Sequence, residues 1–257
     1  MAKTIAVVNQ KGGVGKTTSC VNLAAALTAK GRRVLVCDFD PQGNATSGFG
    51  VDKLTSSPSV YDVVINGADP ARAVVPTKWA DVLPSNKALS GATVELIGMD
   101  RREFLLRDAL ASLSPAYDFI FIDCPPSLEL LTLDALCAAD TLLVPVQCEY
   151  YALEGLSDLL YTIRLAKRRL NPALELEGVL LTMYDARTNL SMQVAEEVKR
   201  HFPGKVYASV IPRNIRLSEA PSYGKPVSAY DSLSRGAEAY STLAEEFLRK
   251  NPAEVKV

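Results

Sequence analysis

A glycine-rich loop near the N-terminus is the part of the sequence whose residue types and spacing point most directly to chemistry. The stretch KGGVGKTT (11–18) follows a short apolar segment and contains Lys16 and Thr17. Glycines in such a loop let backbone N–H groups approach phosphate oxygens closely. The lysine then reaches the β- and γ-phosphates, and the threonine hydroxyl ligates Mg²⁺. We therefore predict a nucleotide site that includes Gly12, Gly13, Val14, Gly15, Lys16, Thr17 and Thr18.

The start of this loop departs from the usual phosphate-binding pattern G-x-x-x-x-G-K-[ST]. Gln10 stands where the first glycine would be, and a second lysine, Lys11, follows it. The loop by itself leaves two interpretations open: Lys11 contacts a phosphate, or it is a solvated surface lysine.

Carboxylates at the ends of two apolar segments could complete such a site. FIFIDC (119–124) leads into Asp123, which we expect to bind Mg²⁺ or its water shell. In CDFDPQG (37–43), Asp38 and Asp40 are two residues apart, so their side chains share one face of a strand. We expect Asp40 to orient the attacking water and Asp38 to contact the hydrated Mg²⁺. The alternative for this pair is turn capping before Pro41.

Short apolar runs alternate with segments of helical period along most of the chain. This alternation predicts an α/β fold, a doubly wound, mostly parallel sheet with helices on both faces, of the P-loop type. Residues 41–99 are expected to be irregular, with a weak strand near 80–84. We expect the chain to form one domain, 1–257. The predicted strands are 4–9, 33–40, 118–124, 141–146, 177–183 and 206–212, and the predicted helices are about 15–30, 100–113, 127–138, 153–170, 188–202 and 234–250.

Composition narrows the class of protein. The 257 residues are 48% hydrophobic and carry a net charge of −1, so any nucleic-acid binding must come from local clusters. Five single cysteines and one histidine favour free thiols over a metal or disulfide framework. No apolar run approaches the ~20 residues of a membrane span. A cleaved leader would remove the loop, so we expect a cytoplasmic protein.

The longer motifs resemble the ParA/Soj family of chromosome- and plasmid-partitioning ATPases. KGGVGKT (11–17) fits the deviant loop K-G-G-x-x-G-K-[ST] of the wider class to which that family belongs. Further matches extend the resemblance from residue 5 to about 230. They are DFDPQGNATSG, DCPPSL, PVQCEYYALEGL, TMYDARTNLS and VIPRNIRLSEAPSYGKPV.

The resemblance implies a function and further site residues. It implies ATP and Mg²⁺ as cofactors and a sandwich homodimer in the ATP state, in which Lys11 reaches the nucleotide of the other subunit. Pro212 and Asn214 would contact adenine, while Arg187 and Arg216 would bind double-stranded DNA without sequence preference. A ParB-like protein would stimulate hydrolysis during chromosome or plasmid segregation, in a cytoplasmic, nucleoid-associated protein.

Several alternatives stay open beside this resemblance. The basic cluster Arg164, Lys167 and Arg168 lies on one helix face, and it could bind DNA or be a solvated surface. A MinD-like membrane ATPase shares the loop but needs a basic amphipathic C-terminal helix, which Asn251-Pro252 would break. An iron–sulfur reductase would need cluster cysteines, and a ligase of the dethiobiotin type would lack PRNIRLSEAPSYGKP.

Overall fold

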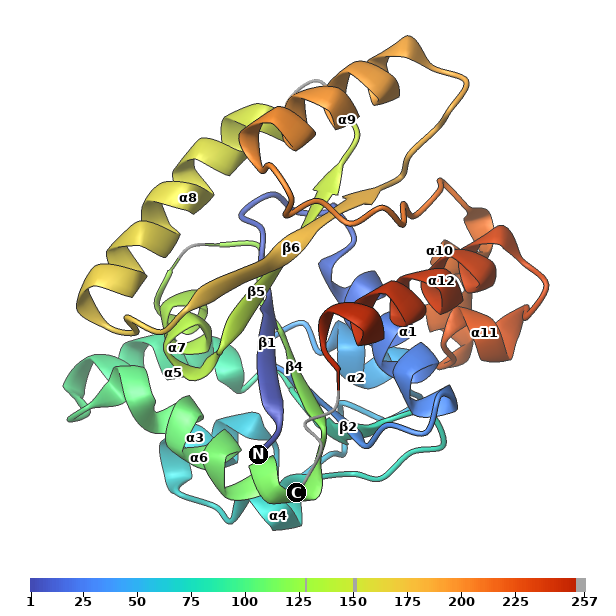
Figure 1. The fold of residues 1–257 in the computed structure, drawn as a ribbon. Coiled ribbons are helices and arrows are strands. Elements are labelled where there is room, and N and C mark those ends of the chain that lie inside the picture. Colours follow the sequence, from blue (N-terminus) through green and yellow to red (C-terminus); the bar gives the residue numbers. More distant parts are fainter. Residues whose placement is uncertain (128, 150–151, 253–257) are drawn as a thin grey trace.

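A parallel sheet forms the centre of the molecule (Figure 1). The computed structural model describes residues 1–127, 129–149 and 152–252, with the side chains of 152–159 left out. In this described part, six strands pair in the order β3-β2-β4-β1-β5-β6, and each neighbouring pair is parallel. The strands are β1 (Lys3–Val7), β2 (Val34–Asp38), β3 (Asp81–Leu83), β4 (Phe119–Asp123), β5 (Thr141–Gln147) and β6 (Glu175–Thr182).

Helices cover both faces of the sheet. One layer contains α1 (Lys16–Ala29), α2 (Asn44–Gly48), α10 (Ile215–Glu219), α11 (Val227–Tyr230) and α12 (Arg235–Lys250). The other contains α3 (Val60–Asn66), α4 (Pro70–Ala73), α5 (Leu89–Glu95), α6 (Leu105–Leu113), α7 (Leu130–Ala138), α8 (Ala152–Arg169) and α9 (Asn189–His201). Short 3₁₀ turns lie at Leu96–Gly98, Arg102–Phe104, Ser114–Ala116 and Ala220–Tyr223.

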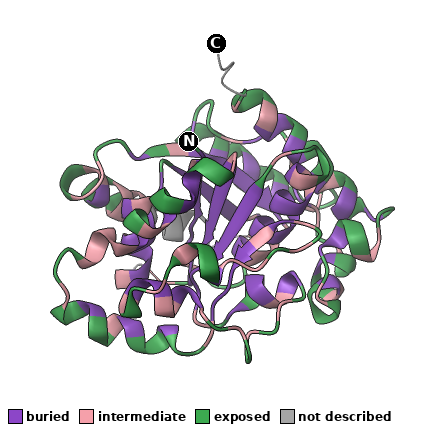
Figure 2. Ribbon diagram, turned by 90° about the horizontal axis from the view of Figure 1, so that it is seen from below, coloured by how far each residue is buried: buried purple, intermediate pink, exposed green. Residues whose placement is uncertain are grey.

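The strands are apolar on both faces because each face is covered. In β1, Ile5 and Val7 pack toward α1 and α12, whereas Ala6 packs toward the opposite helical layer. The interior of the sheet is accordingly buried along its length (Figure 2). This arrangement confirms the predicted fold class, and it matches the predicted strands from 4–9 to 177–183 within a few residues at each end.

The predicted strand 206–212 is wrong as a regular strand. This segment follows the outer edge of β6 through separate bridges, Val179 with Val206 and Tyr184 with Pro212. Between the bridges, the side chain of Glu246 on α12 accepts hydrogen bonds from the backbone N–H groups of Ala208 and Ser209, both at 2.8 Å. The N–H groups of Tyr207 and Ile211 donate to β6, whereas that of Ser209, which a regular strand would also direct at β6, is taken by this carboxylate from a distant helix.

Residues 41–99 are more ordered than the sequence suggests. The expected strand near 80–84 is present as β3, but α2, α3, α4 and α5 also form in this region. Each of them has seven residues or fewer, and isolated helices of that length are unstable in water. Packing of Val60, Val64, Leu89 and Ala92 into the core holds two of them in place.

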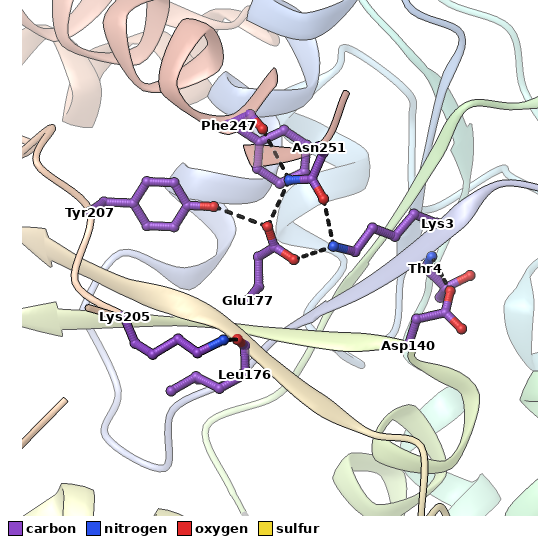
Figure 3. Close-up of polar contacts among 9 residues, drawn as sticks. All are labelled: Lys3, Thr4, Asp140, Leu176, Glu177, Lys205, Tyr207, Phe247 and Asn251. Carbon is purple, nitrogen blue, oxygen red and sulfur yellow. Dashed lines mark hydrogen bonds and ion pairs between the residues drawn. The ribbon is translucent and has the colours of Figure 1, made fainter. Parts of the chain in front are cut away.

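A buried polar network joins the end of α12 (Arg235–Lys250) to the first strand (Figure 3). Glu177 accepts a hydrogen bond from the Lys3 ammonium at 2.5 Å and one from the Asn251 amide at 2.7 Å. Tyr207 donates a third, at 3.3 Å. Burial raises the pKa of Glu177, but the bonds from Asn251 and Lys3 outweigh it, so the net shift is downward. The network anchors α12 at the edge of the sheet where β1 begins.

Replacing Lys3 by Met should lower the free energy of unfolding at neutral pH by about 2 kcal/mol, because a buried carboxylate loses its cation. Urea denaturation measures this loss. The difference should shrink as the pH falls through the lowered pKa of Glu177, since the protonated carboxyl no longer needs Lys3.

Lys199→Met is the matched control for the Lys3 variant. It removes an ion pair with Glu196 in which both side chains are more than half exposed. Such pairs contribute less than about 1 kcal/mol. Equal losses in the two variants would show that the Glu177 network has no special role in stability.

Candidate functional site

The glycine-rich loop joins the end of β1 to the first turn of α1. Gly13 and Gly15 have positive φ angles of 76° and 92°, a conformation that favours glycine. Asn9 holds the start of the loop, because its amide donates to the carbonyl of Pro145 and its oxygen accepts from the N–H of Lys11. The hydroxyl of Thr182, at the end of β6, donates to the carbonyl of Val14 at 2.8 Å. The loop is therefore fixed to β5 and β6, the two strands on one side of β1.

Lys16 is the first residue of α1 and is buried. Its ammonium donates to the carbonyl of Lys11 at 3.0 Å, so the side chain folds back over the loop. Burial lowers the pKa of Lys16, and the nearby carboxylate of Asp123 partly opposes this shift. A buried cation at a helix N-terminus, surrounded by backbone N–H groups, is suited to bind phosphate.

Asp123 ends β4 next to the loop. Strand register places it beside Val7 of β1 on one side and Asp38 of β2 on the other. The side chain is fully buried, and among the described residues no donor makes a hydrogen bond of good geometry to either carboxyl oxygen. Burial and then the charge of Asp38 raise the pKa of Asp123, while the Thr17 hydroxyl and the Lys16 ammonium lower it in part.

These groups fit a divalent cation. Mg²⁺ takes hard oxygen ligands, usually one or two carboxylates together with phosphate oxygens and water. Asp123 supplies two carboxyl oxygens that no donor among the described residues binds with good geometry, and the neighbouring Thr17 supplies a hydroxyl. Mg²⁺ held by these residues would neutralise charge on a bound triphosphate.

Asp38 and Asp40 lie at the end of β2 and in the turn that follows it. Asp38 is fully buried, and its Oδ2 accepts from the N–H and the hydroxyl of Thr46 at 2.7 and 2.6 Å. Burial raises the pKa of Asp38 to about 6, although these bonds oppose the shift. Asp40 caps its own turn by accepting from the N–H of Gln42, as the turn-capping interpretation expects. The water-orienting role of Asp40 and the Mg²⁺ role of Asp38 stay predictions.

A cleft of 410 Å³ opens beside the first turns of α1. The residues that line it include Thr17 and Thr18 of α1, Asn44 and Ser47 of α2, and Lys53. The cleft therefore adjoins the loop on the side of the turn that carries Asp40.

The predicted adenine residues lie next to the strand end that holds the loop. Pro212 forms a bridge with Tyr184, two residues after Thr182. Asn214 caps α10, and its side-chain oxygen accepts from the N–H of Arg216 at 3.0 Å. This leaves the amide nitrogen of Asn214 for another contact, and the adenine role of both residues stays a prediction.

The two arginines predicted to bind DNA lie on neighbouring segments and already have acidic partners. Arg187 is 89% exposed in its side chain and forms two hydrogen bonds with Asp185. Arg216 pairs with Glu219 at 2.7 Å and with Asp231 at 3.2 Å. A hydrogen bond joins the segment before Arg187 to the segment before Arg216: the N–H of Tyr184 donates to the carbonyl of Ile211.

The basic cluster of α8 is not part of this surface. Arg164 and Arg168 are exposed near the end of α8, and Lys167 pairs with Glu175 at 2.6 Å. Figure 1 shows the C-terminal half of α8 on the opposite side of the molecule from α10, which carries Arg216. The structure therefore separates two sets of basic residues that the sequence alone could not place.

Sequence reasoning missed several residues that support the site. Asn9 and Thr182 fix the loop, and Thr46 fixes Asp38. Glu149 lies 3.8 Å from the Lys11 ammonium and 3.3 Å from the Arg213 guanidinium. Apart from Asn9 and Lys11, the partners in these contacts are at least eight residues apart in the sequence. A local sequence motif therefore does not predict the contacts. The adjoining Tyr150 and Tyr151 of PVQCEYYALEGL lie outside the described residues.

The fold and site define a P-loop nucleoside triphosphatase with a deviant loop, and comparisons with known proteins identify the family. A model of an AAA domain matches residues 2–176. The chain is 57% identical to the sporulation initiation inhibitor protein Soj of Bacillus subtilis, over 96% of this chain and 98% of that protein. It is 51% identical to the chromosome partitioning protein ParA of Myxococcus xanthus, over 98% and 89%. The chain belongs to the Soj/ParA family of ATPases.

A solved structure supports the ligand chemistry of this fold. The chain superposes with a TM-score of 0.87 on a protein from Mycobacterium smegmatis described as cobyrinic acid a,c-diamide synthase with bound ATP analogue and magnesium. The two are 39% identical, and the match covers 98% of this chain and 97% of the other. An ATP analogue and magnesium are therefore bound by a protein of the same architecture.

Lys16→Ala should weaken binding of Mg²⁺-ATP by about 10-fold or more, because charge-assisted hydrogen bonds contribute about 1.5–3 kcal/mol. Titration calorimetry measures the affinity. Lys30→Ala, which removes a lysine paired with Glu245 at the opposite end of the same helix, should bind as the unchanged protein does. Unchanged affinity in Lys16→Ala would exclude Lys16 from the phosphate site.

Proposed function

We propose that the protein is an ATP-driven switch in chromosome or plasmid segregation. Binding of Mg²⁺-ATP would assemble a sandwich dimer that binds DNA without sequence preference, and slow hydrolysis would dissolve it. The observation that carries this proposal is the second loop lysine, Lys11, in a chain 57% identical to Soj. Two relatives at 49% and 47% identity are named chromosome partitioning protein ParA and chromosome-partitioning ATPase Soj.

The roles in ATP hydrolysis would be shared by residues at the ends of three different strands. The loop N–H groups and Lys16 hold the phosphates, and Thr17 with Asp123 holds Mg²⁺, with Asp38 near its hydration shell. Asp40 orients the attacking water. Pro212 and Asn214 contact the adenine. Bound Mg²⁺ would supply positive charge beside the phosphates as negative charge develops during phosphoryl transfer.

Lys11 would act on the nucleotide of the partner subunit. Its side chain is 39% exposed, and its ion pair with Glu149 is long and partly exposed. Exposed pairs of this kind contribute less than about 1 kcal/mol, so releasing Lys11 costs little. A triphosphate offers Lys11 more negative charge than a diphosphate does, which would favour the dimer in the ATP state.

DNA binding would use Arg187, in the segment after β6, and Arg216, in α10. Both side chains are accessible, and the two copies in a dimer would double the number of phosphate contacts. Their acidic neighbours limit each contact, which suits weak monomer binding and stronger dimer binding. A ParB-like partner would stimulate hydrolysis, and this part of the proposal comes from the resemblance.

Two other functions have less support. The diamide synthase description belongs to a protein 39% identical to this chain, well below the 57% shared with Soj. A MinD-like membrane helix would need a free apolar face, but Tyr240, Leu243 and Phe247 of α12 are buried. No helix in the described ranges could cross a bilayer. The five terminal residues, 253–257, lie outside those ranges.

Mixing two impaired variants tests whether Lys11 acts across the interface. Lys11→Ala and Asp40→Ala proteins should each hydrolyse ATP at least about 10²-fold more slowly than the unchanged protein. In a mixed dimer, the Lys11→Ala subunit keeps its own Asp40 and receives Lys11 from its partner. One site per dimer is then complete, so mixing should restore activity. No recovery, although mixed dimers form, would show that Lys11 acts in its own subunit.

The salt dependence of binding tests the DNA surface. Arg216→Gln should weaken binding of the ATP-bound dimer equally to two unrelated duplexes. The slope of log affinity against log salt should fall by about 0.9 per lost contact, or nearly two for both subunits. Arg33→Gln, which removes an exposed arginine paired with Asp118 at the start of β2, is the control and should have no effect. Unchanged DNA affinity in Arg216→Gln would remove this residue from the interface.

A further inference from the structure

We infer that Thr46 is a positioning residue for ATP hydrolysis, which acts by fixing the turn that carries Asp40. This inference rests on the proposed hydrolytic role of Asp40 and adds a residue to that site. Thr46 belongs to the short helix α2, beyond the turn.

The hydroxyl of Thr46 both donates and accepts a hydrogen bond. It donates to Oδ2 of Asp38 at 2.6 Å and accepts from the N–H of Ser85 at 3.0 Å. The backbone N–H of Thr46 donates to the same carboxyl oxygen at 2.7 Å. Thr46, Asp38 and Ser85 are all fully buried. Thr46 therefore joins the end of β2 to the segment that follows β3.

The turn between β2 and α2 is fixed at both of its ends by these bonds. The other oxygen of Asp38 accepts from the N–H of Asp40 at 3.3 Å. The N–H of Gly43 donates to the carbonyl of Asp40 at 2.9 Å, and the N–H of Gln42 donates to its carboxylate. The carboxylate of Asp40 is thus oriented by a turn whose first residue is held by Asp38 and whose last residue leads into α2.

Thr46 is a polar anchor for α2, a helix too short to be stable alone. A five-residue helix does not persist alone, because helix nucleation is unfavourable. The N–H of Thr46 is a first-turn donor without an intrahelical partner, and Asp38 at the end of β2 accepts it. Without the Thr46 hydroxyl, Oδ2 of Asp38 would accept only the backbone N–H of Thr46. The N–H of Ser85 would also lose its acceptor on α2. Asp40 would then sample orientations unsuited to attack, and a shift of about 1 Å in a reacting group can cost 10²-fold in rate.

The test separates positioning from nucleotide binding and from stability. Thr46→Val keeps the side-chain shape and removes the hydroxyl. Its kcat should fall by between about 10- and 100-fold, with the affinity for Mg²⁺-ATP changed less than twofold. Thr46→Ser retains the hydroxyl and should restore kcat to within about threefold. If Thr46→Val does not fold, Thr46→Ala is measured in the same way.

Thr141→Val is the matched control. Thr141 is also a buried threonine, but it begins β5 at the opposite end of the strands. Its replacement should leave kcat unchanged whatever its effect on thermal stability. In a double variant with Asp40→Ala, Thr46→Val should cause no further loss of rate, because the residue acts through Asp40.

A wild-type kcat in Thr46→Val, a parallel loss of ATP affinity, or an additive loss in the double variant would overturn the inference. Failure of the proposed function looks different. In that case the unchanged protein would not hydrolyse ATP, or Asp40→Ala would hydrolyse it at the full rate.

Discussion

Burial of negative charge at the carboxyl edge of the sheet is the constraint on which the site depends. Asp38 and Asp123 are fully buried on adjacent strands, and Lys16 is a buried cation close to Asp123. Carboxylates removed from water are unstable unless they are hydrogen-bonded or neutralised. Asp38 meets this need with Thr46 and the N–H of Asp40, whereas Asp123 has no donor of good geometry among the described residues. A divalent cation is the chemistry that would satisfy Asp123.

Strand order explains how distant parts of the chain meet at this edge. β1 lies between β4 and β5, with β2 beyond β4 and β6 beyond β5. The loop after β1 is therefore flanked by Asp123 on one side and by Pro145 and Thr182 on the other, and the latter two hold it through hydrogen bonds. The same edge carries the segments with Arg187 and Arg216, so nucleotide and DNA surfaces would share one rigid frame.

The sequence predicted what depends on local pattern. The apolar strands and the loop were predicted because their residue types directly favour buried strands and phosphate binding. The predicted helix boundaries agreed with the structure to within a few residues, except at α6, which begins at Leu105 after a 3₁₀ turn. The strand at 206–212 failed because Glu246, on α12, takes the N–H groups of Ala208 and Ser209. The short helices α2 to α5 were missed because tertiary packing stabilises them. Thr46 and Thr182 were missed because their partners lie eight and 168 residues away.

Dependence of subunit assembly on the third phosphate is the central claim, and light scattering of Asp40→Ala protein tests it most directly. This variant should bind ATP without destroying it. The account predicts twice the mass of one chain with ATP and Mg²⁺, and the mass of one chain with ADP and Mg²⁺ or with ATP and a chelator. The same mass in all three conditions would contradict it, because the nucleotide would then not control the dimer.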